Sequence, residues 1–205
     1  SITVIGKAKE ERIVKRSGAK ETDLLVTTGD LGAAYAGLLL LERERKVFEK
    51  TPEIQPEFSG FDYVLERQLK PEARVDIVKR LEELDVIPTS MIDISDGLGS
   101  EILHLCKESK VGCHLYENKI PLDVQTQQVA DDFGIHSATL ALNGGEDYQL
   151  LFTISQSDFD KIKGDVSFVV IGHIMDEGTG AQMITEIDKA IPIRAQGWDG
   201  LKAEQ

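Results

Sequence analysis

The sequence predicts an α+β fold, in which helices pack on one side or both sides of a mixed β-sheet. Short aliphatic runs alternate irregularly with longer segments that have helical periodicity. Two glycine turns, at 29–32 and at Gly97, each join the end of a strand-like run to the start of a helical one. A third turn, 178–180, predicts a hairpin near the end of the chain. This pattern is typical of an α+β or mixed layer structure.

The elements follow in order along the chain. Aliphatic and β-branched runs predict strands at 2–5, 24–28, 91–94, 113–116, 149–154, 166–174 and 181–187. Helical patterns occur at 33–50, 61–69, 73–84, 98–110, 123–133, after residue 137, and at 155–163. In the amphipathic segment 73–84 we expect Val75, Val78, Leu81 and Leu84 to face the core. The small residues at 33–37 let the backbone of the first long helix approach a sheet closely.

Composition limits the classes of function. The chain has 205 residues, 41% of them hydrophobic, which is enough for one large core or two small ones. A formal net charge of -13 argues against a nucleic-acid partner. No apolar run is long enough to span a membrane. Cys106 and Cys113 have no C-x-x-C neighbour, so we expect reduced thiols in a cytoplasmic protein and no zinc site.

The stretch 90–98 combines two carboxylates, a hydroxyl and a glycine turn at the end of a predicted strand. Strand alternation should place Asp93 and Ser95 on one side, and a helix starts directly after Gly97. Carboxylates are hard oxygen donors suited to Mg²⁺, and a helix start attracts phosphate oxygen. A simpler interpretation is that Ser95 or Asp96 only caps the helix and Gly97 only makes the turn.

Two other turns have the same ambiguity. The turn 29–32 precedes a helix and suits phosphate, although close helix packing explains its small residues equally well. The segment 144–148 has two glycines and an acidic pair before an apolar strand. We favour a functional loop there over a hairpin, because the residues before it are predicted to be helical.

Two residues stand apart from these turns. Arg16 follows a charged segment and precedes a Ser-Gly-Ala turn, where it is either a solvated loop cation or a phosphate ligand. Trp198, the one tryptophan, is flanked by glycine at 197 and by Asp-Gly at 199–200. That setting suits a stacking platform better than a core position.

Three motifs occur in order: GDLGAAYAGL at 29–38, IDISDGL at 92–98 and GGEDYQLLFT at 144–153. Together with Gly197-Trp198 they resemble the thiamine-monophosphate kinase family, which is part of the aminoimidazole-ribonucleotide-synthetase superfamily. The resemblance covers nearly the whole chain. It implies the fold of that superfamily's C-terminal domain, a homodimer in the full-length protein, and ATP-dependent phosphorylation of thiamine monophosphate to thiamine diphosphate with Mg²⁺.

The resemblance also implies roles for individual residues. It makes Asp93 and Asp96 Mg²⁺ ligands, Arg16 and Ser95 ATP contacts, and Glu146 and Trp198 thiamine monophosphate contacts. It implies no acid–base residue, because phosphoryl transfer between polyanions depends on positioning and charge neutralisation.

The departures from the family are equally informative. The family has an N-terminal domain with further metal ligands and much of the ATP site, so we expect 1–205 to be the C-terminal domain of a larger kinase, inactive alone. The chain starts at Ser1, which fits that expectation, although processing also removes an initial Met. Asp30 departs from the usual turn and receives no role. Two alternatives remain: another ATP-dependent synthetase of the superfamily, such as a purine-biosynthetic or selenophosphate synthetase, or a non-catalytic ligand-binding module.

Overall fold

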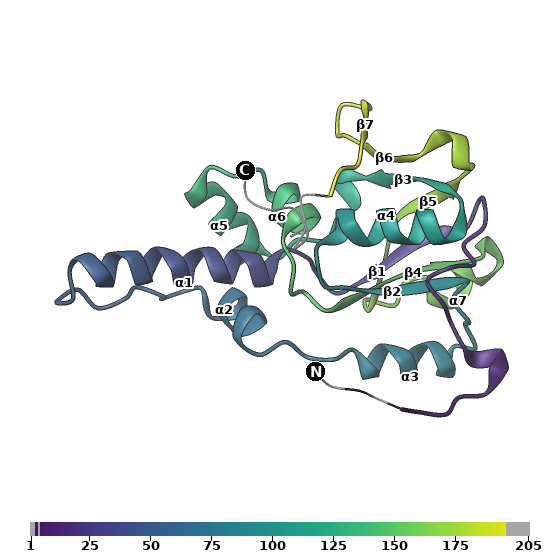
Figure 1. Ribbon diagram of the computed structural model, residues 1–205, viewed down its shortest axis with the longest axis horizontal. Coiled ribbons are helices and arrows are strands. Elements are labelled where there is room, and N and C mark those ends of the chain that lie inside the picture. The colour runs from purple at the N-terminus through teal and green to yellow at the C-terminus, as the bar shows by residue number, and fades with distance from the viewer. Residues whose placement is uncertain (1–2, 4, 196–205) are drawn as a thin grey trace.

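The computed structural model describes residues 3 and 5–195, and its described strands form a single mixed sheet (Figure 1). The strands are β1 (Leu24–Thr28), β2 (Ser90–Ile94), β3 (Gly112–Tyr116), β4 (Gln149–Ile154), β5 (Phe168–Met175), β6 (Ala181–Ile184) and β7 (Ala190–Pro192). Their order across the sheet is β2-β4-β1-β5-β3-β6-β7. All neighbours are antiparallel except β3 and β6, which are parallel. The predicted α+β fold with a mixed sheet is confirmed.

The helices fall close to the predicted segments. They are α1 (Ala33–Lys50), α2 (Asp62–Leu69), α3 (Val75–Glu83), α4 (Leu98–Ser109), α5 (Val124–Phe133), α6 (Ser137–Asn143) and α7 (Phe159–Ile162). Four single 3₁₀ turns accompany them: η1 (Glu10–Arg12), η2 (Glu117–Lys119), η3 (Gln156–Asp158) and η4 (Glu177–Thr179). The segment predicted as one helix at 155–163 is therefore η3 followed by the single turn of α7.

The sheet is covered on both faces because its central strands alternate between two apolar cores. Leu25 and Leu151 point to the face covered by α4, where Leu98, Ile102 and Leu105 meet them in one buried cluster. The next residue of each strand points to the opposite face. There Val26 and Phe152 pack with Ile77 and Leu81 of α3 and Ile162 of α7. We call these the α4 face and the α3 face.

A third core lies beside the sheet, within the helices α1, α2, α5 and α6. Figure 1 shows α1 projecting from the sheet with α2 and α5 alongside it. Gly37 explains the close contact of α1 and α2, because a Cβ at that position would overlap the Val64 carbonyl oxygen. The small residues of α1 thus serve close packing, but against a helix rather than against the sheet.

The predicted hairpin at 178–180 is wrong. β5 and β6 do not pair, because β3 lies between them and β6 runs parallel to β3. The connection is η4, where the Asp176 carboxylate accepts hydrogen bonds from the backbone N–H (3.2 Å) and hydroxyl (2.8 Å) of Thr179. This turn carries the chain past the end of β3 instead of reversing it onto β5.

Two further expectations are corrected. In α3, Val75 and Val78 are each 56% exposed, while Ile77 and Leu81 are buried and Leu84 packs against the same cluster, so only the predicted Leu81 and Leu84 face the core. At the N-terminus, Ile5 is 92% exposed and outside any strand. Residues 2 and 4 of the strand predicted at 2–5 lie outside the described residues. Every helix in the described part of the chain is too short or too polar to cross a lipid bilayer.

Candidate functional site

The three motif turns meet at one end of the sheet. Because β2 and β4 are antiparallel neighbours, the end of β2 lies beside the start of β4. The Glu146 N–H donates to the Ser95 carbonyl (2.8 Å), and the Tyr148 N–H donates to the Ile94 carbonyl (2.8 Å). Gly145 lies so close to the Ser95 carbonyl that no side chain would fit there. The 144–148 segment is thus docked on the 92–98 motif by its backbone.

Glycines start both neighbouring helices. Gly97 has φ +111°, and a Cβ there would lie 2.8 Å from the Leu142 carbonyl oxygen. Gly32 has φ +78°, and a Cβ there would lie 2.8 Å from the Ala141 N atom. Each is the N-cap of its helix, α4 and α1 respectively, so in neither helix does the N-cap residue itself make a side-chain hydrogen bond. The interpretation of Ser95 or Asp96 as a helix cap is therefore wrong.

The exposed part of the site is acidic. Asp93 and Asp96 are exposed, while the flanking Ile92 and Ile94 are buried. The Tyr148 hydroxyl donates to a Glu146 carboxylate oxygen (2.9 Å), and this bond is the main reason that the pKa of Tyr148 is raised. Burial and the negative charges of Glu146, Asp93 and Asp96 raise it further, in keeping with an acidic surface around Tyr148. We call Asp93, Asp96 and Glu146 the acidic edge.

The backbone at the acidic edge is strained. Glu146 has φ +71° and Tyr148 has φ +51°, a region that residues with a Cβ seldom occupy. Strained positions of this kind cost of order 1–3 kcal/mol each and persist only where the surroundings enforce them. Here the two residues are held by their backbone hydrogen bonds to Ser95 and Ile94 and by the buried side chain of the residue between them.

Asp147 anchors the strained segment from below. It is 1% exposed, and its carboxylate accepts hydrogen bonds from the N–H groups of Gly32 (2.6 Å) and Ala34 (3.3 Å) at the start of α1. Arg67 Nη2 donates to the Asp147 carbonyl (3.1 Å) and lies 3.8 Å from its carboxylate. Burial raises the pKa of Asp147 to about 6, although the two N–H bonds oppose the shift.

Glu101 is a second buried carboxylate beneath the site. It is 2% exposed, and its Oε1 accepts a hydrogen bond from the Asp96 N–H (3.1 Å). Its Oε2 has no hydrogen-bond partner among the described residues. Burial raises its pKa to about 7. Sequence reasoning missed Glu101, since one carboxylate on a helix gives no signal that it folds back to the preceding turn.

Asp30 has a structural contact that the sequence did not predict. Its carboxylate accepts a hydrogen bond from the Tyr63 hydroxyl of α2, and that bond adds to burial in raising the pKa of Tyr63. Tyr63 and Arg67 line a polar cavity of about 400 Å³ between α2 and the start of β4. The turn 29–32 therefore joins the helical core to the site through two carboxylates, Asp30 and Asp147.

The structure thus brings four of the predicted site residues together and places a fifth, Arg16, elsewhere. Asp93, Ser95, Asp96 and Glu146 share the end of the sheet. Arg16 is exposed and lies beside the far end of α4, where the Ser109 hydroxyl donates to its carbonyl (3.4 Å). The 12 residues of α4 span about 18 Å, so Arg16 is remote from the acidic edge. Trp198 lies outside the described residues.

Comparison with known proteins agrees with these motifs. Thiamine-monophosphate kinase from Aquifex aeolicus is 36% identical over 181 residues, 88% of this chain and 53% of that protein. The enzyme from Buchnera aphidicola of Schizaphis graminum is 34% identical over 197 residues, 93% of this chain and 57% of that protein. The chain is similar to the C-terminal portion of thiamine-monophosphate kinases. It spans about half the length of the curated relatives it matches. No family model matches the chain.

Solved structures of thiamine-monophosphate kinases share the fold. AaThiL complexed with AMPPCP and TMP aligns with a TM-score of 0.76 at 31% identity, covering 93% of this chain and 55% of that one. A crystal structure of the kinase from Aquifex aeolicus gives 0.72 at 31% identity, with 90% and 56% coverage. HypE from E. coli, a hydrogenase maturation protein, gives 0.65 at 12% identity, with 92% and 54% coverage, a likeness of fold alone.

Proposed function

We propose that this chain is the C-terminal domain of a kinase that transfers the γ-phosphoryl group of ATP to thiamine monophosphate, giving ADP and thiamine diphosphate. The observation that carries the proposal is the docking of the 144–148 segment on the 92–98 motif, which gathers Asp93, Asp96 and Glu146 beside the start of α4. The relatives that share these motifs are thiamine-monophosphate kinases. The rest of the nucleotide site would come from the part of those proteins that this chain does not match.

Magnesium fits the residues at the acidic edge. Asp93 and Asp96 are exposed carboxylates, and no Lys, Arg or His of the described residues pairs with them. No group of three or more His, Cys, Asp or Glu in the described chain is arranged to hold a metal ion. Two carboxylates suffice for Mg²⁺ when phosphate and water supply its other oxygens. Bound there, Mg²⁺ would neutralise phosphate charge during transfer.

The chain's own residues would position the two substrates. The first turn of α4 presents backbone N–H groups that attract phosphate oxygen, and Ser95 precedes it as an ATP contact. Glu146 would accept a hydrogen bond from thiamine monophosphate, held in place by Tyr148 and by the anchored Asp147. Trp198 would stack on a thiamine ring. Arg16, the other predicted ATP contact, lies beside the far end of α4, so within this chain Ser95 is the predicted ATP contact that shares the acidic edge.

A chimera tests the proposal directly. This chain would replace the matching C-terminal portion of the Aquifex aeolicus kinase, and thiamine diphosphate formation would be measured with ATP and Mg²⁺. We expect the chimera to be active as a homodimer, and the 205-residue chain alone to form no thiamine diphosphate. We propose that the full-length enzyme is cytoplasmic. Product from the chain alone would contradict its assignment as one domain. A folded chimera that leaves thiamine monophosphate unchanged but phosphorylates another acceptor would favour a different superfamily synthetase.

A further inference from the structure

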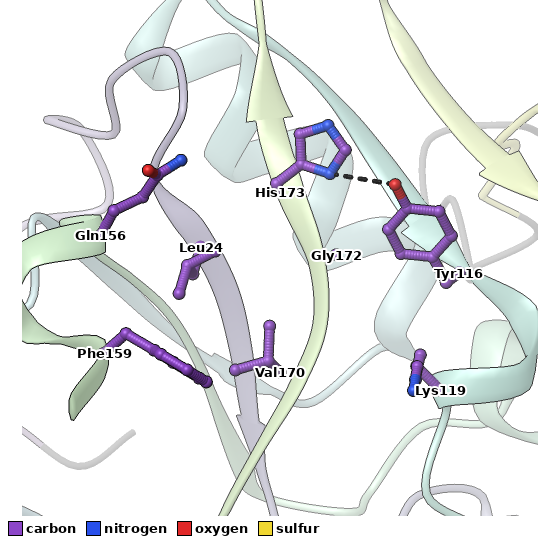
Figure 2. A pocket seen from close by; sticks show the side chains of 8 residues that line it. All are labelled: Leu24, Tyr116, Lys119, Gln156, Phe159, Val170, Gly172 and His173. Carbon is purple, nitrogen blue, oxygen red and sulfur yellow. Dashed lines mark hydrogen bonds between the residues drawn. The ribbon is translucent and has the colours of Figure 1, made fainter. Parts of the chain in front are cut away.

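A second cavity lies on the α3 face of the sheet, away from the acidic edge. Its volume is about 550 Å³, and its lining residues are Leu24, Tyr116, Lys119, Gln156, Phe159, Val170, Gly172 and His173 (Figure 2). Leu24 begins β1 and Thr28 ends it beside the site, so about 13 Å of strand separates the cavity from the motif turns. None of the proposed kinase residues lines it.

The cavity has an apolar floor between two aromatic walls. Leu24, Val170 and Gly172 form the floor, from the central strands β1 and β5. Figure 2 shows Phe159 on one side of these strands and Tyr116 on the other. Tyr116 stacks on His173 with ring centroids 5.8 Å apart and an angle of 26°, and its hydroxyl lies 3.3 Å from His173 Nδ1. An apolar floor flanked by aromatic side chains suits a flat group, and we call this cavity the slot.

The electrostatics of the slot differ from those of the whole protein. The chain carries 36 acidic residues, yet none of the eight residues lining the cavity is acidic. Burial, together with the nearby His114 ring, lowers the pKa of His173, which keeps it uncharged at neutral pH. Lys119 is then the one charged residue of the lining. Gln156 uses its amide N–H on the Thr22 carbonyl (3.0 Å), which leaves its oxygen free as an acceptor.

We propose that this cavity binds a small molecule that has a flat aromatic ring and one anionic substituent. The ring lies between Phe159 and the Tyr116–His173 pair, and the anion lies at the rim beside Lys119. A volume of about 550 Å³ falls within the range of small-molecule pockets, which are mostly apolar with a few orienting polar groups. The site is separate from the proposed kinase function and gives the chain a second ligand.

Binding of 2-naphthoate to the 205-residue chain tests the proposal, with calorimetry for affinity and amide NMR shifts for location. We expect saturable binding with shifts confined to the lining residues. Lys119→Glu should weaken binding about fivefold or more, since it reverses the charge at the rim. Lys107→Glu, an exposed lysine of α4 on the other face of the sheet, is the matched control and should have no effect. Val170→Trp should fill the slot and abolish binding, with its melting temperature measured alongside.

Other outcomes overturn the proposal. Absence of saturable binding, shifts centred on the acidic edge, or equal weakening by both lysine variants would each refute the site. Equal affinity for the neutral 2-naphthamide would refute the anionic requirement. Displacement of 2-naphthoate by ATP would show that the ligand occupies the kinase site instead. If Val170→Trp unfolds the chain, the exposed pair Lys119→Glu and Lys107→Glu still decides the question, because neither side chain is part of a core.

Discussion

The end of the sheet holds two layers of carboxylates with opposite surroundings. In the lower layer, Asp147 and Glu101 are buried and their oxygens accept backbone N–H bonds from the turns. In the upper layer, Asp93, Asp96 and Glu146 are turned outward, and the first two have no cationic partner in the described chain. The difference teaches that carboxylates at one end of a sheet can serve two purposes. The buried layer fixes the backbone, and the exposed layer is left for ligands.

Replacing Asp147 by Ala should have the largest effect on stability. The variant loses two N–H acceptors at the start of α1 and leaves Arg67 without its buried partner. We expect the free energy of unfolding to fall by about 3 kcal/mol. Denaturant titration of the chain measures it. Asp147→Asn, which keeps one acceptor oxygen, should lose less stability. A loss under about 1 kcal/mol for Asp147→Ala would show that Asp147 does not fix the backbone.

Glu101 should make stability depend on pH. Its pKa in the folded chain is about 7, raised from 4.5, so its stabilising contribution is full below pH 4.5 and is lost as the pH rises through 7. Relative to Glu101→Gln, the wild-type chain should lose up to about 3 kcal/mol between pH 5 and pH 8. Unfolding curves of both proteins across this range test the sign. Parallel pH profiles would show that Glu101 is not a buried acid in solution.

Asp96→Asn should affect turnover strongly and stability little, the opposite of what we expect for the buried carboxylates. The side chain is exposed and caps no helix, so the free energy of unfolding should change by less than about 0.5 kcal/mol. In the active chimera the same change should lower turnover by about tenfold or more at limiting Mg²⁺, because an amide is the poorer ligand. Lost stability with unchanged Mg²⁺ dependence would show that Asp96 has a structural role and is not a Mg²⁺ ligand.

Tyr148→Phe should have the smallest effect. It removes one hydrogen bond to Glu146 at the surface, which is worth about 0.5 kcal/mol or less in stability. Its use is as a control for the strained segment. A loss several times larger would show that the Tyr148 hydroxyl also enforces the positive φ of Glu146 and Tyr148, which we assign to Asp147 and to the backbone hydrogen bonds with the 92–98 motif.

Local patterns located β1 to β6, and β1 and β4 match their predicted ends, whereas β7 was not predicted and Ile5 of the strand predicted at 2–5 is outside any strand. The position of β6 was not predictable, since a tight glycine turn gives no sign that a third strand separates the two that it joins. Likewise, the acidic pair at 146–147 gives no sign of which member is buried. Positive φ on both sides of Asp147 breaks the side-chain alternation that such reasoning relies on.

The same geometric reason applies to α3 and to Arg16. Helical periodicity located α3 but not the side that the sheet covers, so Val75 and Val78 were assigned to the core. Arg16 was assigned to ATP phosphate by residue type and by the family resemblance, neither of which indicates that its loop crosses the far end of α4, and its role stays a prediction. The motifs carry the local chemistry, and the separations across the sheet come only with the three-dimensional arrangement.

The central position of β1 has a consequence for synthesis. Both of its neighbours, β4 and β5, come late in the chain, and 120 residues separate Thr28 from Gln149. At about 5–20 residues per second, a ribosome needs roughly 6–24 s to make that interval. Throughout it, β1 has neither of its partner strands, and both of its edges are open to other chains. The nascent protein therefore depends on shielding of β1, and a chain halted before β4 is a substrate for aggregation or chaperones.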